Sequence, residues 1–599
     1  MANESFANTL VIEVEGRALP ADVKTLLAYA SVDDSRNLPD MFVLRFRDPG
    51  GVVLKKAGFQ VGAKVALKAQ TAEPGGPQSL ITGEVTAIGV DIDRTGTFTE
   101  VRGFDRAHRL FRGRRVAAYP NMTIADVVRK VTQRAGLAVG TIDNVKGVGG
   151  RPHTQFSQDN ASDWEFLSRL ADLVGAQIVV IEGKLDFRVP QQPSGAPDTS
   201  AKAHTDPLVL EAQRTLIALR ASVGATEQVP EVRVRGWDIE NKQEVTATAT
   251  PKTLGVEVSG VDPVDLAKKF GSPPLLVADA PYRTQAEAKA TADALAAQIG
   301  GACAEIEGVA KGNPKLRAGT PVALANVAEP FAGKYLLTST RHLFNAQVGY
   351  TTEFTVSGRQ ERSLYGLVTG GRGSGRVPRG LVSGTVSDVK DPAKLGRVKL
   401  TFPWLDKDFV TNWARVVQPG AGKNRGAVVL PEVGDEVLVG FEHGDVEAPY
   451  VLGGLHNGKD TLPALSTEPI DGTSGEIAAR AFVSRKGHKV EFVENDGIVI
   501  ASGDGKLSIK LDTKNQKIEV TGGTGVTVKA ENGVTVDAGT GPLELKGQKV
   551  SLTSTSDVAV QANAAVKVQG ATVSVTGQGQ AELTANGAVT VRGATVRIN

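Results

Sequence analysis

The sequence has a single cysteine, Cys303, among 599 residues, and it has no run of 18 apolar residues. One cysteine excludes an intrachain disulfide framework and is typical of folding in a reducing compartment. The N-terminus lacks the basic and apolar regions of a signal peptide, and no segment is long enough to span a bilayer as an apolar helix. These absences predict that the protein is cytoplasmic while it is made and assembled.

Neither sign of charge dominates, because 68 Lys and Arg residues face 66 Asp and Glu residues. No global field therefore favours nucleic acid or an anionic membrane. From Val493 to the C-terminus there is no Phe, Tyr, Trp, His or Cys, and Pro542 is the only proline. This segment lacks a histidine base, a thiol nucleophile and an aromatic platform for a sugar or a base. We therefore expect a mechanical role for it.

What the segment has is a repeat of paired apolar residues. Eleven pairs run from Ile518/Val520 to Val596/Ile598, and their first members are spaced 7 to 9 residues apart. Because side chains alternate faces along a strand, both members of a pair point the same way. Each step of about eight residues therefore predicts one short strand and a turn.

The length of the step decides what kind of repeat this is. A single-chain solenoid needs roughly 20 residues or more per coil, so a step of eight residues provides only one face. The other faces must come from other chains, and three copies winding around one axis would pair every strand edge. At ~4.7 Å per step the repeat would be roughly 50 Å long. The sequence thus predicts a homotrimeric triple-stranded β-helix, or β-prism, over residues 498–599.

Valine dominates the pairs, and these valines form the predicted core of the trimer. The predicted core residues are Val526, Val528, Val534, Val536, Val550, Val558, Val560, Val566, Val568, Val573, Val575, Val589 and Val591.

Upstream, the pattern is mainly β with a few helices. Alternating apolar and polar residues predict strands at 9–14, 41–46, 64–69, 81–92, 231–235, 302–309 and 350–356. Capping signals at Thr123, Ser162 and Thr284 predict three helices, which we expect to end at Gly136, Gly175 and Gly300. The two strand-rich stretches are therefore 1–115 and 205–360.

A glycine-rich stretch at 366–379 is predicted to be a linker, and a compact run of short strands follows it. These strands are expected at 381–389, 396–402, 412–417, 426–430, 436–441 and 450–453. Five or six strands in fewer than eighty residues predict a small barrel of the oligonucleotide/oligosaccharide-binding (OB) type. Such barrels often bind nucleic acid through exposed aromatic and basic residues. Here Trp404 adjoins Pro403 and Asp406, so we expect a structural barrel without nucleic acid.

Three groups of residues offer chemical alternatives to a mechanical protein. They are an arginine-rich phosphate patch at 103–115, an acid/base set of Glu476, His488, Glu491 and Glu494, and a metal site of His443, Asp445 and His456. Phe104, Leu110 and Phe111 interrupt the arginines, which favours a partly buried element with a solvated basic face. The glutamates alternate like a strand, and the last set lacks tight ligand spacing. We expect no catalytic residue, no cofactor and no metal.

Several motifs resemble one family. The motifs are Leu381-Val-Ser-Gly-Thr-Val-Ser-Asp-Val-Lys-Asp-Pro-Ala-Lys-Leu-Gly-Arg-Val-Lys-Leu-Thr-Phe-Pro-Trp404, Trp413-Ala-Arg-Val416, Pro431-Glu-Val-Gly-Asp-Glu-Val-Leu-Val-Gly-Phe-Glu-His-Gly-Asp445 and Pro449-Tyr-Val-Leu-Gly-Gly-Leu-His-Asn457. They resemble the barrel of valine-glycine repeat (VgrG) spike proteins. Gly103-Phe-Asp-Arg-Ala-His-Arg-Leu110 and Gln158-Asp-Asn-Ala-Ser-Asp-Trp-Glu-Phe-Leu-Ser-Arg-Leu-Ala171 resemble the hub segments of the same proteins and of phage late-control hub proteins.

The resemblance implies a division of the chain into parts. These are a hub of two β-barrel-like domains with helices at 1–365, the linker at 366–379, the OB barrel at 380–457, a connection at 458–497 and the needle at 498–599. It also implies a contractile injection system, in which a trimeric spike links the inner tube and the baseplate to a needle that punctures a membrane. The implied partners are inner tube and baseplate proteins, effector cargo and, transiently, the target membrane.

A tip protein of the proline-alanine-alanine-arginine repeat (PAAR) type usually caps such needles. We expect it to dock on Val596, Arg597, Ile598 and Asn599, because the sequence ends in the repeat itself. The short connection and the lack of a segment after the needle predict that no enzyme domain is present. The features look most like the spike of an extracellular phage-tail-like particle. A type VI secretion spike or a phage tail spike or hub is the alternative, and a carbohydrate-binding trimeric fibre is a more distant one.

Overall fold

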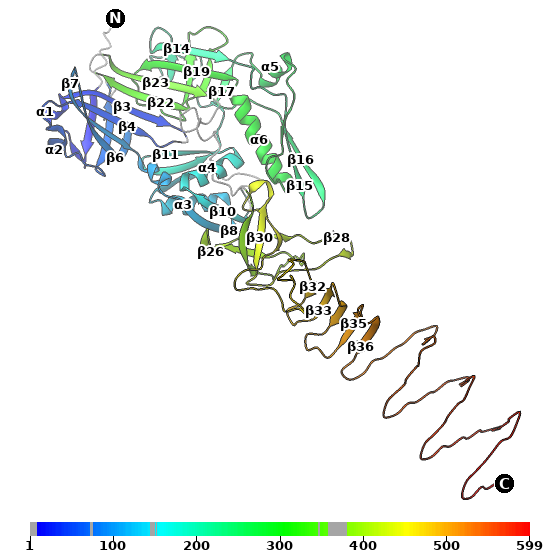
Figure 1. The fold of residues 1–599 in the computed structure, drawn as a ribbon. Coiled ribbons are helices and arrows are strands. Elements are labelled where there is room, and N and C mark those ends of the chain that lie inside the picture. Colours follow the sequence, from blue (N-terminus) through cyan, green and yellow to red (C-terminus); the bar gives the residue numbers. More distant parts are fainter. Residues whose placement is uncertain are drawn as a thin grey trace. The chain divides into compact units, whose positions relative to one another are not determined.

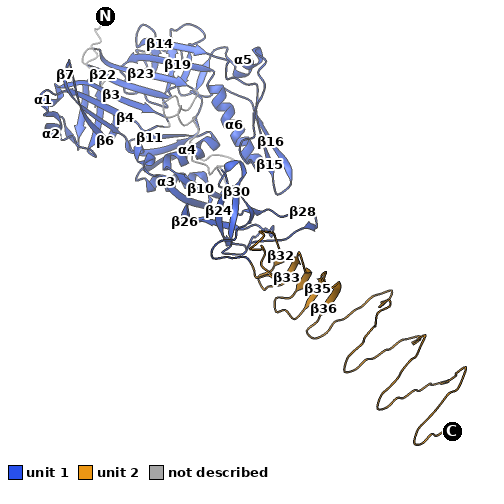
Figure 2. Cartoon of the chain, in the orientation of Figure 1, with its two compact units in different colours: residues 1–462 blue, residues 463–599 orange. Residues whose placement is uncertain are grey.

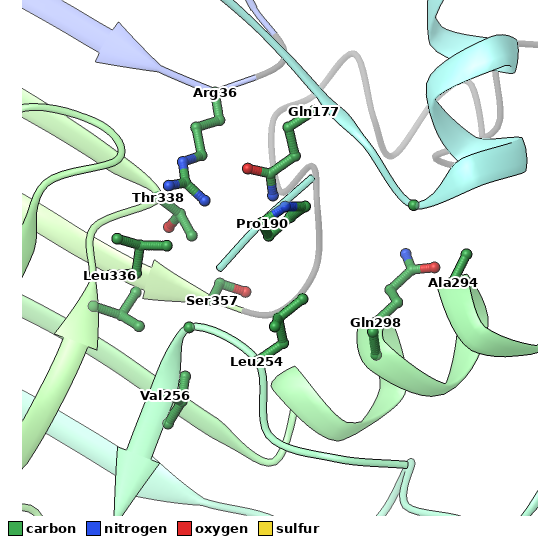
Figure 3. Close-up of a pocket in the computed structure, with 14 residues that line it drawn as sticks. Arg36, Gln177, Pro190, Leu254, Val256, Ala294, Gln298, Leu336, Thr338 and Ser357 are labelled. Atoms are coloured by element: carbon green, nitrogen blue, oxygen red, sulfur yellow. The ribbon is translucent and has the colours of Figure 1, made fainter. Parts of the chain in front are cut away.

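The computed structural model describes residues 9–36, 38–71, 76–143, 150, 152–345, 348–357 and 380–598. The predicted linker at 366–379 and Asn599 lie outside the described residues. The chain divides into two compact units, 1–462 and 463–599, which Figure 2 shows in different colours. Strands make up 39% of the structure and helices 12%, so the mainly β fold class is confirmed.

A sheet of eleven strands brings the two strand-rich stretches together in the first unit (Figure 1). Its strands, in spatial order, are β14 (Leu216–Val223), β19 (Ala304–Lys311), β23 (Gly349–Ser357), β22 (Ser339–Asn345), β3 (Leu27–Ser35), β4 (Met41–Arg47), β7 (Gly96–Phe104), β6 (Gln78–Asp93), β5 (Lys64–Gln70), β1 (Thr9–Val14) and β2 (Arg17–Ala18). The junction is the antiparallel pair of β22 and β3, in which Ser339 lies opposite Ser35. Two apolar cores follow from this arrangement, one around Phe42 and Leu44 and one around Ile306 and Tyr335.

Helices and smaller sheets complete this part of the chain. They are α1 (Ala21–Lys24), α2 (Val53–Ala57), the 3-10 helix η1 (Arg106–Phe111), β8 (Arg115–Met122), α3 (Ile124–Arg134), β9 (Ala138–Ile142), β10 (His153–Ala161), α4 (Asp163–Val174), β11 (Gln177–Ile181), β12 (Lys184–Arg188), β13 (Val209–Glu211), β15 (Val232–Asp238), β16 (Gln243–Ala249), β17 (Val256–Val258), α5 (Pro263–Lys269), β18 (Leu275–Val277), α6 (Gln285–Gly301), β20 (Pro321–Ala325) and β21 (Gly333–Leu336). Side chains from α3 and α4 share a buried core that includes Val127, Val131 and Leu167.

The three predicted helix starts are confirmed as reciprocal capping boxes at Thr123, Ser162 and Thr284. The predicted end of α6 at Gly300 is wrong, because the helix continues to Gly301. A Cβ atom at Gly300 would lie 2.3 Å from the carbonyl oxygen of Lys252. This glycine is therefore needed for close approach to a neighbouring backbone rather than for ending the helix.

The OB barrel consists of six strands in the order β26 (Asp406–Val410), β25 (Lys399–Phe402), β24 (Val382–Asp388), β30 (Glu436–Phe441), β31 (Pro449–Gly454) and β27 (Arg415–Val416). Phe402, Phe409 and Val437 are fully buried in its core. Strand β26 was not predicted, because Asp406 and Asp408 interrupt its apolar pattern.

The strand predicted at 426–430 is wrong. A two-residue hairpin of β28 (Ala421–Gly422) and β29 (Arg425–Gly426) precedes this segment, and residues 427–430 form no strand. The Gln418 side chain makes the hydrogen bonds that a neighbouring strand would otherwise make. Its oxygen accepts from the Val429 N–H at 2.8 Å, and its amide donates to the Val429 carbonyl at 2.9 Å. The backbone groups of Val429 are thus satisfied without a partner strand.

Strand β8 and the start of β10 join the OB barrel to the upstream part of the same unit. Ala118 of β8 packs against the barrel core, and the Gln155 amide donates to the carbonyl oxygen of Val410 at 3.1 Å. Arg283 forms an ion pair with Glu442 at 2.9 Å. The barrel is therefore held by specific polar contacts as well as by apolar packing.

Glu447 lies at the centre of this junction, where its carboxylate accepts from the backbone N–H of Ser157. Burial raises the pKa of Glu447 to about 8, and the neighbouring charge of Asp445 acts in the same direction. The pKa of His153 is also raised, chiefly by its hydrogen bond to Glu287. Both shifts mean that the folded protein holds protons that the unfolded chain would release near neutral pH.

Gly103 opens one of the motifs that resemble hub proteins, and its place in the sheet explains why a side chain is not tolerated. It lies opposite Phe42 of β4 and Val85 of β6. A Cβ atom there would lie 2.3 Å from the Glu84 carbonyl oxygen and 2.4 Å from the Phe42 ring. We expect Gly103→Ala to lower the free energy of unfolding by ~1–3 kcal/mol, measured by chemical denaturation.

Gly89, on β6 of the same hairpin, is the matched control, because a Cβ atom there would meet nothing within 4 Å. Gly89→Ala should change the free energy of unfolding by less than ~0.5 kcal/mol. Equal effects of the two substitutions would contradict the packing role of Gly103.

Glu447→Gln tests the junction, because glutamine keeps an oxygen that can accept from Ser157 but cannot ionise. The contribution of Glu447 is complete below its ordinary pKa near 4.5 and is lost as the pH rises through about 8. The melting temperature of the variant should therefore rise relative to wild type across this window. Glu244→Gln, at an exposed site, should show no such trend, and parallel curves for wild type and Glu447→Gln would refute the assignment.

Candidate assembly surface of the C-terminal repeat

The second unit begins with five consecutive antiparallel strands. They are β32 (Ala479–Val483), β33 (Lys489–Val493), β34 (Gly497–Ala501), β35 (Ser508–Asp512) and β36 (Lys517–Thr521). The first pair of the repeat lies in β36, where Ile518 and Val520 face Leu511 and Ile509. The needle was predicted to start at residue 498, which lies within β34, so the sheet includes residues on both sides of that boundary. The predicted domain boundaries stay predictions.

After β36 the chain has no regular partner of its own. No helix or strand occurs at the described residues 522–598, which run in switchbacks in Figure 1. Within 523–598, the one backbone-to-backbone hydrogen bond joins the Gly541 N–H to the Ala538 carbonyl at 2.9 Å. Because strand backbone requires partners, the repeat is left with two unpaired edges along its described length.

The predicted core valines are all exposed in the single chain. Their exposed fractions run from 48% at Val589 to 84% at Val575. In each pair with two large side chains from Val526 onward, the first member is less exposed than the second, as at Val566 and Val568. The pairs therefore form a regular apolar stripe that the chain itself does not cover. The homotrimer that would bury them stays a prediction.

The end of the repeat has the same character. Val596 is about half exposed, Ile598 is nearly fully exposed, and Arg597 lies between them. Asn599, the fourth predicted docking residue, lies outside the described residues. Docking of a tip protein on these residues stays a prediction.

The alternative acid/base set has structural partners in the second unit. Burial acts to raise the pKa of Glu491, but hydrogen bonds from Lys489 and Ser466 outweigh it and lower the pKa. The Lys489 ammonium lies 2.6 Å from Glu491, and the Ser466 hydroxyl lies 2.7 Å from it. Glu494 pairs with Arg480, and His488 accepts from the Gly503 N–H at 3.2 Å. These contacts give the groups a structural role.

The arginine-rich segment of the first unit is also occupied by internal contacts. Arg109 lies 2.6 Å from Glu84, and Arg114 lies 2.8 Å from Glu165. Leu110 of η1 is fully buried. The prediction of a partly buried element is thus confirmed, and internal ion pairs take up much of the positive charge that a phosphate would need.

The described part of the chain contains no group of three His, Cys, Asp or Glu residues placed to hold a metal ion. His443 lies in the 3-10 turn η3 (Glu442–Gly444) with a φ of 51°, next to the Asp445 that binds the Glu447 N–H. Among the described helices, none is long and apolar enough to cross a membrane.

Two family models match the chain. The type VI secretion system/phage-baseplate injector OB domain matches residues 382–456, which coincide with the observed barrel. The Alg8 N-terminal domain matches residues 57–345, which is less than half of the chain. The first match confirms the OB-type barrel.

Curated relatives match over short segments. The type VI secretion system spike protein VgrG1b of Pseudomonas aeruginosa is 35% identical over 130 residues, which are 21% of this chain and 17% of that protein. VgrG3 of Vibrio cholerae is 40% identical over 73 residues, which are 11% of this chain and 7% of that protein. The chain thus spans less than a fifth of these relatives.

Solved structures give matches of low identity. The E. coli c3393 protein, a component of the type VI secretion system, has a TM-score of 0.45 at 16% identity over 74% of this chain and 99% of that one. The Francisella PdpA–VgrG complex, half-lidded, has a TM-score of 0.49 at 9% identity over 87% and 89%. Both scores lie below 0.5.

The predicted resemblance to VgrG-type spike proteins is confirmed by the OB-domain match and by the similarity to curated VgrG proteins. Residues 382–456 match an OB domain of the type VI secretion system/phage-baseplate injector type, and the chain is similar to VgrG-type spike proteins over part of its length.

Proposed function

We propose that this protein is the structural spike of a contractile injection system. In this proposal a homotrimer links the inner tube and the baseplate to a needle that punctures a target membrane. The observation that carries the proposal is the repeat at 523–598, whose valine pairs and backbone groups have almost no partners within the described chain. A segment of this composition, without aromatic residues or histidine, suits a mechanical role better than a chemical one.

Trimerisation would satisfy the repeat physically. Three chains offer a shared apolar axis and close every strand edge, so that unfolding one chain would expose the other two. A trimer has about three times the chain mass of 62.7 kDa, which light scattering resolves easily. A stable monomer in light scattering would refute the proposal.

The remaining parts have roles that follow from the spike. We assign residues 1–365 to the tube and baseplate, the OB barrel to the support of the needle, and the end of the repeat to a PAAR-type tip protein. Effector cargo is a further expected partner. We expect assembly in the cytoplasm and action as part of a particle, without enzyme activity in this chain.

The type of machine has two candidates. An extracellular phage-tail-like particle is the first, on the grounds of the needle composition and the compact hub. A type VI secretion system is the second candidate, and it is supported by the curated relatives, which are spike proteins of that system.

Val566→Asp tests the needle. In a trimer it would bury three unpaired carboxylates at one level, so we expect the variant to lose most of its trimer in light scattering at concentrations where wild type is assembled. Lys567→Asp is the matched control, because the neighbouring side chain points to the opposite face and should leave the mass unchanged. An intact, equally denaturant-resistant Val566→Asp trimer would refute the inward assignment.

Ile598→Asp tests the tip. We expect it to abolish co-purification of a PAAR-type tip protein while the trimer keeps its mass, because a charge would replace the exposed apolar end. Arg592→Gln, in the last but one step of the repeat, should leave co-purification intact. Retention of the tip protein by Ile598→Asp would move the docking site elsewhere.

A further inference from the structure

The first unit contains a small polar cavity that the spike role does not explain. It has a volume of about 320 Å³ including its mouth, and its polar lining comes from Asp40, Asp105, Glu182, Ser79, Thr82 and Arg317. These residues come from the turn before β4, the start of η1, the β11–β12 turn, β6 and the segment before β20. The cavity thus lies where distant parts of the chain meet.

The wall of the cavity contains more negative than positive charge. Asp34, Asp40 and Asp105 are each at least 94% buried. Arg317 forms an ion pair with Asp34 and lies 3.4 Å from Asp40. Asp34 also interacts with the charge of the partly buried Arg36, so two guanidinium groups face three buried carboxyls and one negative charge is left over.

Asp105 is the group with unused bonding capacity. Its Oδ1 atom accepts from the Ala107 N–H at 3.0 Å and caps η1. Its Oδ2 atom is buried and has no hydrogen-bond partner among the described residues. A buried acceptor without a partner costs ~1–3 kcal/mol and therefore requires an explanation.

The electrostatics agree with this geometry. Burial raises the pKa of Asp105 to about 8, and the charge of Asp34 adds to the effect. Burial and the charges of Asp34 and Asp105 raise the pKa of Asp40 well above its usual range. Both shifts favour the protonated carboxyls, and a cation in the cavity would favour their charged forms instead.

The donor set favours an organic cation over a metal ion. No group of three acidic, His or Cys residues is placed to hold a metal within the described ranges. An ammonium or guanidinium group donates separate hydrogen bonds and needs only a few acceptors, which two carboxylates and the Thr82 hydroxyl can supply. We propose that this cavity binds an ammonium or guanidinium group, held by Asp40 and Asp105 with Glu182 at the rim.

The cation can come from two sources. One is a basic side chain of a second copy of this chain, which rests on the proposed trimer. The other is a free amine, which does not. In both cases Asp105 is the residue that the cation neutralises.

Asp105→Asn is the decisive variant, because asparagine preserves the cap of η1 and removes the charge. Asp22→Asn, at an exposed ion pair with Lys56, is the matched control. Oligomer mass, its concentration dependence and the melting temperature are measured above pH 8, with and without millimolar n-butylamine. Butanol serves as the uncharged control for the ligand.

Two results support the proposal. If a neighbouring copy supplies the cation, Asp105→Asn weakens assembly by at least about tenfold in concentration, and butylamine has no effect on wild type. If the source is a free amine, butylamine raises the melting temperature of wild type by several degrees, butanol does not, and Asp105→Asn does not respond.

The proposal is overturned if butylamine has no effect and Asp105→Asn assembles normally with an equal or higher melting temperature. Asp105 would then be a protonated buried acid whose neutral replacement is harmless. Light scattering of the wild type decides the oligomeric mass separately from the cavity. If the wild type is a monomer, the proposed trimer is refuted, and the effect of butylamine on the melting temperature alone tests the cavity.

Discussion

Unpaired strand backbone is the constraint on which the rest of this structure depends. The described repeat has valine pairs on one face and N–H and C=O groups along both edges, and residues 523–598 make a single backbone hydrogen bond among themselves. A chain of this kind gains order only when other chains supply both the apolar contacts and the hydrogen bonds. The proposed spike role rests on that dependence, since a rod made of interlocked copies would resist force in a way that one chain does not.

The first unit, in contrast to the repeat, buries its apolar side chains within the chain itself. Its eleven-stranded sheet and OB barrel have buried cores of their own, so this part of the chain folds around its own apolar side chains. Polar contacts then determine how the barrel attaches. Gln155, Ser157 and Arg283 each meet a barrel group, and such contacts are specific because a buried polar group without its partner is costly.

Buried acids in the first unit share one physical theme. Glu447 at the barrel junction and Asp105 at the small cavity both have pKa values raised to about 8 by burial. Apolar packing alone would not need ionisable groups at these places. Because the folded protein favours the protonated form of each, the contacts that these two acids make between distant segments are expected to weaken as the pH rises.

The sequence by itself determined the features that depend on local pattern. The capping boxes at Ser162 and Thr284, strand β1 and the OB barrel follow from neighbours a few residues apart. The period of the valine pairs likewise predicts that other chains, rather than further coils of the same chain, complete the repeat. Only the tertiary structure showed that Gly300 packs against Lys252, that Gln418 replaces a strand partner for Val429, and that Asp34, Asp40 and Asp105 gather around Arg317. Those contacts join residues far apart in the chain, and no local period records them.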